Sequence, residues 1–259
     1  MCNLRAIGTL FVILSPAVSA WADAPQAPPP PAEGVWFGKG QFGFLSSKGN
    51  SEAQSINAAI DLARIDGPWK NAFFLGGLYG KSAGIVSAER WESRVQSNYT
   101  IAGNMFAFGA LRYEHDMFNG FQYQASITAG LGYKIIDTDI DKLTGQLGVG
   151  YRRLRPEDIT KDSKGAVIAR ILGTATGDAI LSAGLDYTHK FSATTVFSNK
   201  FLMEAGKSDT LLHDDLALTV KMSDKLALSV GYGITDNTKP PGTLKKLDTV
   251  ATVNLVFAF

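Results

Sequence analysis

The feature of this sequence that most restricts its fold is a strict alternation of apolar and polar residues. Between residues 122 and 135, apolar side chains occupy every odd position, and glycine or polar side chains occupy every even one. A period of two over this length indicates a β-strand with two different faces, and an α-helix would not produce it. The same alternation recurs at residues 91–101, 143–152, 181–188, 216–222 and 226–235.

Turn-forming residues divide the chain into about twelve expected strands. Pairs such as Gly49-Asn50, Gly103-Asn104 and Asn119-Gly120 separate the alternating runs. The strands are expected to begin near residues 35, 52, 69, 87, 105, 121, 142, 178, 194, 210, 225 and 246. Connections at one end are short, whereas the longest at the other end are the expected loops 155–177 and 236–245.

Two classes of protein are compatible with twelve alternating strands, namely a soluble periplasmic β-protein and an outer-membrane barrel. Many runs exceed ten residues, whereas strands of globular proteins usually have ~5–6. Short turns at one end and longer loops at the other are typical of outer-membrane barrels. We therefore predict an all-β fold, a transmembrane antiparallel β-barrel of the bacterial outer membrane. Phe257 and Phe259 share one face of the last strand and are expected to form the signal read by the barrel-assembly machinery.

The N-terminal residues are expected to direct export and to lie outside the barrel. Residues 1–22 are typical of a signal peptide, with Arg5 before an apolar segment and Ala20-Trp21-Ala22 as the cleavage site. Residues 23–34 are proline-rich and predict an extended spacer. The barrel is expected to span residues 35–259. Cys2 is the only cysteine, which excludes an internal disulfide and a cysteine-built zinc site.

Charged residues with inward parity are the candidate pore-lining residues. Placing one on the lipid face would be costly, roughly 2–4 kcal/mol for arginine or lysine at mid-depth. The set contains seven basic and six acidic residues, and this balance predicts little preference between anions and cations. They could line a narrow polar channel or fill a closed, salt-bridged interior. The residues are Asp61, Arg90, Glu92, Arg94, Arg112, Glu114, Asp116, Lys134, Arg152, Asp186, Lys200, Glu204 and Lys221.

Aromatic residues raise two further points about the strands. Phe106 and Phe108 share parity with Arg112, which predicts either a β-bulge or a crowded periplasmic end of the lumen. Other aromatic side chains are suited to the interfacial girdles, where their rings would meet the lipid headgroups. These are Trp69, Trp91, Tyr99, Tyr133, Tyr151 and Phe259.

Other classes of function find little support in the sequence. The formal net charge of +1 gives no basic face for nucleic acid. An outer-membrane lipid hydrolase remains as an alternative, but it needs a nucleophilic serine beside a histidine. His115 is expected near an outer loop, His189 at the periplasmic end and His213 in a loop. The aspartates at 137, 139 and 141 lack the glycine and distal glutamate of an EF-hand loop, so we expect no metal or cofactor.

Several short strings, taken in order, resemble a known family. Residues 112–118 read R-Y-E-H-D-M-F, and G-x-G-Y occurs at 130–133 and at 148–151. The other strings are Trp36 before Gly43 and Gly49-Asn50-Ser51, Pro240-Pro241-Gly242 before Asp248-Thr249, and the closing 256–259. Together they resemble the YdiY-like family of salt-induced outer-membrane proteins, which is classed as a domain of unknown function. The resemblance implies a barrel in contact with outer-membrane lipid, and it supplies no solute and no catalytic residue.

The functional expectation is accordingly broad. The chain is expected to be a narrow, weakly selective pore or an envelope protein of salt or osmotic stress, and not an enzyme. The alternative is a closed structural or surface-recognition barrel with the 155–177 loop as its contact surface.

Overall fold

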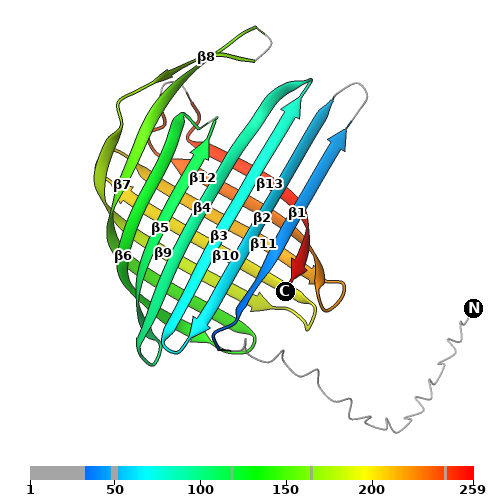
Figure 1. Ribbon diagram of the computed structural model, residues 1–259, viewed down its shortest axis with the longest axis vertical. Coiled ribbons are helices and arrows are strands. Elements are labelled where there is room, and N and C mark those ends of the chain that lie inside the picture. Colours follow the sequence, from blue (N-terminus) through cyan, green and yellow to red (C-terminus); the bar gives the residue numbers. More distant parts are fainter. Residues whose placement is uncertain (1–32, 48–51, 118, 164–165, 242–243) are drawn as a thin grey trace, which may run out of the picture. The chain divides into compact units, whose positions relative to one another are not determined.

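The computed structural model describes residues 33–47, 52–117, 119–163, 166–241 and 244–259, and within them the chain is built from β-strands (Figure 1). The predicted signal peptide and most of the predicted spacer lie outside the described residues. Among those described, no helix is long and apolar enough to cross a membrane. The strands are β1 (Trp36–Ser47), β2 (Ala53–Asp66), β3 (Trp69–Ser82), β4 (Ile85–Ala102), β5 (Met105–Asp116), β6 (Phe121–Asp137), β7 (Asp141–Lys161), β8 (Val167–Leu172), β9 (Thr176–Lys190), β10 (Thr195–Gly206), β11 (Thr210–Lys221), β12 (Leu226–Asn237) and β13 (Leu247–Ala258).

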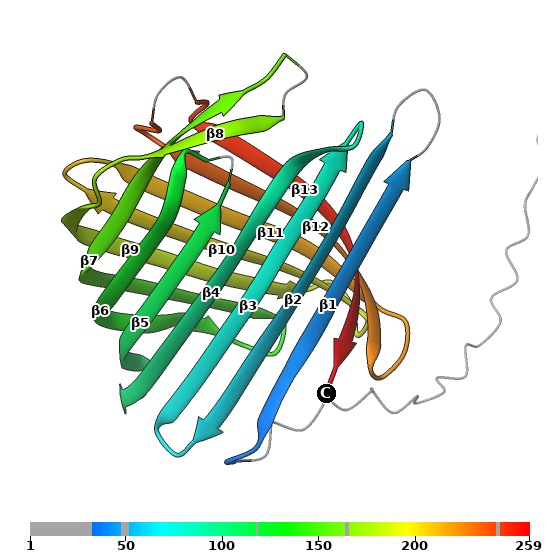
Figure 2. The same cartoon turned by 45° about the horizontal axis from the view of Figure 1, so that its top comes forward.

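Twelve of these strands close into an antiparallel barrel. Each strand pairs with the next along the chain, except that β7 pairs with β9, and β1 pairs with β13 to complete the ring. β1 and β13 meet over four residue pairs, from Lys39–Ala258 to Phe42–Leu255, and this seam closes the sheet as a sheet in lipid requires. Figures 1 and 2 show the tilted strands wrapped around one lumen. The predicted twelve-stranded barrel is confirmed.

Strand β8, which is not one of the twelve strands of the ring, corrects one prediction. Residues 155–177 were expected to form a loop, but β7 continues to Lys161 and β8 pairs with its last five residues. The resulting hairpin extends past the barrel rim (Figure 2). An ion pair of 2.8 Å joins Arg170 Nη1 of β8 to Glu157 Oε1 of β7. Neither face of this hairpin has to meet lipid, so the period-two pattern that revealed the other strands is missing here.

Burial in the barrel wall is the reverse of that in a soluble protein. On β6, the apolar Ile127 and Leu131 are exposed outward, whereas Gln124, Ser126 and Thr128 are buried inward. Other strands of the ring show the same reversal, with apolar side chains exposed on the outside. Examples are Leu147, Val149, Val230 and Val253. An apolar exterior around a polar interior is the pattern of a barrel in lipid. The chain is therefore an integral outer-membrane barrel.

Phe106 and Phe108 point into the lumen from β5, where both are buried. The pairing of β5 with both neighbours is regular from Phe106 to Glu114, so the structure rules out a bulge at these positions. Glycines on the next strands make room for the two rings. A Cβ at Gly132 would lie 2.2 Å from the Phe106 ring, and one at Gly148 would lie 2.9 Å from the Phe108 ring. Crowding of the lower lumen is therefore the correct explanation.

Candidate functional site

The lumen brings most of the predicted pore-lining residues together. Nine of the thirteen line two cavities, namely Asp61, Arg90, Glu92, Arg94, Arg112, Asp116, Asp186, Lys200 and Glu204. Glu114 and Arg152 are buried in a charge network beside the cavities. Lys134 lies near the lower rim, 3.5 Å from Asp137, and Lys221 is the last residue of β11. Phe257 and Phe259, the predicted assembly signal, lie outside the lumen with exposed rings 6.4 Å apart.

Arg112 on β5 is the centre of the charge network. Its Nε lies 3.1 Å from Glu92 Oε1 on β4, and its Nη2 bonds Glu114 on its own strand. Arg90 and Arg94 add contacts of 3.2 Å to Glu114 and 3.4 Å to Glu92. The side chains of Arg112, Glu92 and Glu114 are nearly inaccessible to solvent. Charges so buried are stable only when each has a partner, and here every carboxylate has at least two.

The network also crosses the lumen. Arg112 Nη1 lies 3.6 Å from Glu204 Oε2 on β10, although β6, β7 and β9 separate these strands along the wall. Glu204 accepts a hydrogen bond of 2.7 Å from Ser126 and lies 4.0 Å from Arg152. Arg152 in turn donates to the Asp209 carbonyl at 2.7 Å. These contacts fill the upper lumen on the side enclosed by β5 to β10.

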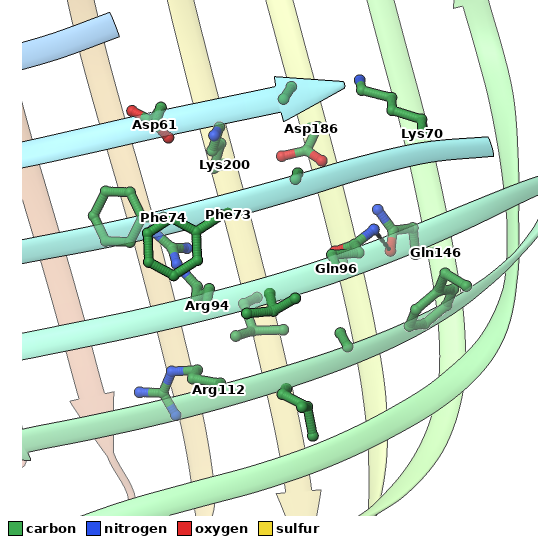
Figure 3. A pocket seen from close by; sticks show the side chains of 18 of the residues that line it. Asp61, Lys70, Phe73, Phe74, Arg94, Gln96, Arg112, Gln146, Asp186 and Lys200 are labelled. Carbon is green, nitrogen blue, oxygen red and sulfur yellow. Dashed lines mark hydrogen bonds between the residues drawn. The ribbon is translucent and has the colours of Figure 1, made fainter. Parts of the chain in front are cut away.

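A second bridge crosses the lumen at a lower level. Gln96 of β4 donates to Gln146 Oε1 of β7 at 3.1 Å, across the two intervening strands (Figure 3). Gln96 also donates to Asn98 at 2.8 Å, which fixes its amide. The Phe106 and Phe108 rings are inward-facing on β5, one of the two strands that the bridge spans. These side chains narrow the lower lumen on the side of β4 to β7.

Two adjoining cavities remain in the lumen. The upper one lies on the side opposite the charge network, whereas the lower one is also walled by residues of β5, β6, β7 and β9. The lower cavity has a volume of about 590 Å³ and the upper one about 470 Å³. Both contact the same residues at their junction, namely Lys39, Asp61, Phe74, Arg94, Lys200 and His213. Figure 3 shows part of the lower cavity, with Asp61, Lys200, Asp186 and Lys70 around the open space. The Arg94 guanidinium lies 4.3 Å from the centre of the Phe74 ring and is held at this junction.

His213 corrects a second expectation. It lies within β11, buried and facing the lumen, and not in a loop. Its Nδ1 is 2.9 Å from Thr235 Oγ1 and its Nε2 is 3.1 Å from Asp215 Oδ2. The polar residues 213–215 interrupt the alternation of apolar and polar residues that would indicate a strand. Ala217 and Thr219 face inward, however, and His213 has the same parity, so the sequence does contain a signal for its position. His115 on β5 and His189 at the lower end of β9 are on other strands, so the three histidines do not meet.

The aspartates of the β6–β7 turn take part in separate contacts. Lys142 donates to Asp137 at 3.1 Å, and this hydrogen bond lowers the pKa of the Asp137 carboxyl. Asp141 Oδ1 lies 2.7 Å from His189 Nδ1 and 2.8 Å from the Tyr187 hydroxyl, contacts that lower the pKa of Asp141. Among the described residues, no group of three or more histidine, cysteine or acidic side chains is placed to hold a metal ion.

Comparison with known families assigns the chain. The family model described as "Protein of unknown function, DUF481" matches residues 40–259. The chain belongs to the DUF481 family. The uncharacterized protein YdiY of Escherichia coli (strain K12) is 23% identical over 240 residues, covering 90% of this chain and 87% of that protein. The resemblance seen in the sequence is thereby confirmed.

Solved structures similar to this DUF481 chain include barrels of several kinds. The COG4313 outer membrane channel from Pseudomonas putida F1 has a TM-score of 0.48 and 9% identity, covering 88% of this chain and 96% of that one. The NanC porin has a TM-score of 0.45 and 11% identity, with 86% and 98% covered. The translocator domain of NalP from Neisseria meningitidis has a TM-score of 0.45 and 13% identity, with 87% and 88% covered.

The strings that carried the resemblance now have structural roles. Arg112 and Glu114, in the R-Y-E string, are central to the charge network. Gly132 and Gly148, in the two G-x-G-Y strings, make room for the inward rings of β5. Residues 49–51, 118 and 242 of the other strings lie outside the described residues.

Proposed function

We propose that this DUF481 chain is a narrow passive pore for small hydrophilic solutes. The observation that carries the proposal is the pair of adjoining cavities in the lumen, about 590 and 470 Å³ in volume. Their walls present amide, hydroxyl and charged groups, which replace the hydration of a polar solute. A twelve-stranded barrel lies between the filled eight-stranded kind and the open porins of 16–18 strands.

The filled side of the lumen restricts what could pass. The Gln96–Gln146 bridge and the Arg112–Glu204 contact both cross the interior, at two levels. A solute in the upper lumen is therefore confined to the side lined by β1 to β4 together with β10 to β13, whereas the lower cavity also reaches residues of β5, β6, β7 and β9. This arrangement supports a pore that admits small solutes and rejects bulky ones. A role in salt or osmotic stress, implied by the resemblance, belongs to the same proposal.

Single-channel recording with two matched variants tests the proposal. Ala59 faces the upper cavity from β2, and its neighbour Ile60 lies on the outward face beside the exposed Leu75. Ala59→Trp places a large ring in the passage, whereas Ile60→Trp places the same ring on the lipid face. We expect stable conductance in the wild type and in Ile60→Trp, and a severalfold smaller conductance in Ala59→Trp. A silent wild-type barrel in planar bilayers would contradict the proposal.

Surface recognition is a second candidate, because the β7–β8 hairpin carries exposed apolar side chains. Ile168 and Ile171 are 64% and 65% exposed on the hairpin beyond the barrel rim. Large apolar side chains at such a tip favour contact with a partner. Deleting the hairpin should leave conductance intact if the barrel is a pore. If the function of the protein is surface recognition, the deletion should instead reduce binding of the partner to cells that carry the barrel.

A further inference from the structure

The charges inside the barrel are sorted by level. Among the described residues, strand alternation and register place seven lysines inward in the half that contains the short turns, together with four aspartates, Asp61, Asp137, Asp186 and Asp215. The lysines are Lys39, Lys70, Lys134, Lys142, Lys190, Lys200 and Lys221. The lumen is near neutral as a whole, as the sequence suggested, but this half carries a clear excess of positive charge.

The upper half differs because its cations are arginines that already have partners. Arg90, Arg94, Arg112 and Arg152 each lie within 4.0 Å of a buried glutamate. Their charge is compensated within the protein, and little attraction is left for a solute. Any attraction for an anion is therefore concentrated in the lower half.

Several of the lower lysines form no close ion pair, although Lys200 lies opposite Asp186 and Asp215 in the sheet register. Lys39 reaches Asp61 at 3.8 Å, and Lys134 and Lys142 share Asp137. Among the described residues, no ion pair or hydrogen bond engages the ammonium group of the remaining four, which are Lys70, Lys190, Lys200 and Lys221. Lys70 and Lys200 line the lower cavity, and Figure 3 shows both side chains at its edge beside Asp186.

We propose that the lower cavity is a binding vestibule for a small organic anion that carries two or more carboxylate or phosphate groups. The inference rests on the proposed function, because it names the class of solute for the same lumen. Lys39, Lys70 and Lys200 approach the cavity from β1, β3 and β10, so their ammonium groups surround it. Lysine is a compact point charge with rotatable donors, which suits anionic oxygens at several positions.

The size and lining of the cavity agree with this class of ligand. A volume of about 590 Å³ is within the ~300–1,000 Å³ of small-molecule sites. Ser182, Thr128 and the Gln146 amide add neutral hydrogen-bonding groups to the wall. Short turns mark the periplasmic end of an outer-membrane barrel, so the vestibule would face the periplasm.

Titration calorimetry on the folded full-length chain in detergent tests this proposal without requiring conductance. Citrate is the probe, and uncharged trimethyl citrate is its control. The double variant Lys70→Gln/Lys200→Gln removes two vestibule charges, and Lys225→Gln removes a lysine from an exposed turn at the same end. Folding of each variant is checked by a gel shift between unheated and boiled samples.

We expect citrate, and not its ester, to bind the wild type and Lys225→Gln alike. The double variant should bind citrate at least tenfold more weakly. Raising the salt from 0.05 to 0.5 M should weaken wild-type binding, since salt screens solvent-accessible charges. Equal citrate affinity in the folded double variant would overturn the proposal, as would a wild type that binds no citrate. A silent barrel that still binds citrate would refute the pore and leave the vestibule standing.

Discussion

Loss of the Arg112 side chain should destabilise the barrel by a predictable amount. Breaking a buried ion pair by removing one partner costs ~3–5 kcal/mol, because the remaining charge is left unpaired. Here Glu114 keeps Arg90 at 3.2 Å, Glu92 keeps Arg94 at 3.4 Å, and Glu204 keeps Arg152 at 4.0 Å. We therefore expect Arg112→Ala to lower the free energy of unfolding by about 2–3 kcal/mol.

Urea unfolding in lipid vesicles, followed by tryptophan fluorescence, measures this change. Arg64→Ala is the matched control, since Arg64 lies 3.0 Å from Asp66 in an exposed pair at the rim. Such a pair contributes under about 1 kcal/mol. Adding Glu114→Gln to Arg112→Ala should restore part of the lost stability, because one unpaired charge disappears with it. Equal losses in Arg112→Ala and Arg64→Ala would refute the buried network.

Three further substitutions test other parts of the structure. Gly132→Val should lower stability by ~1–3 kcal/mol through overpacking against Phe106, and the loss should shrink when Phe106→Ala is added. Asp214 is an outward-facing carboxylate whose described contact is a hydrogen bond from Asn199, so Asp214→Leu should raise stability by about 1 kcal/mol in the same urea assay; a loss of stability would show that this face does not meet lipid. Phe259→Ala should lower the amount of heat-modifiable barrel in outer-membrane fractions without lowering export, and an unchanged amount would show that this ring is not needed for assembly.

The strands of the barrel could be predicted from the sequence because lipid and lumen impose opposite demands on adjacent residues. Gln124, Ser126 and Thr128 had to face inward once Ile127 and Leu131 faced lipid. All twelve barrel strands begin within two residues of their expected positions. The β8 strand was missed because it lies past the rim, where neither face has to be apolar.

Contacts across the lumen could not be predicted in the same way. Parity places Arg112 and Glu204 inside, but three strands separate them on the wall, and only the curvature of the closed sheet brings them to 3.6 Å. His213 was misplaced because Asp214 puts a charge on the outer face beside it. To predict the excess of lysines in one half of the lumen, the depth of each residue in the barrel must be known, and parity alone does not give it.

Accessibility of single cysteines tests the central claim most directly, that the β5–β10 side of the upper lumen is filled and the opposite side is open. With Cys2 changed to serine, Ala59→Cys reports on the open side, Gln124→Cys on the filled side, and Ile60→Cys on the lipid face. A small water-soluble thiol reagent should label Ala59→Cys rapidly in the folded barrel. It should leave Gln124→Cys and Ile60→Cys unlabelled until unfolding. Equal labelling of Ala59→Cys and Gln124→Cys would contradict the claim.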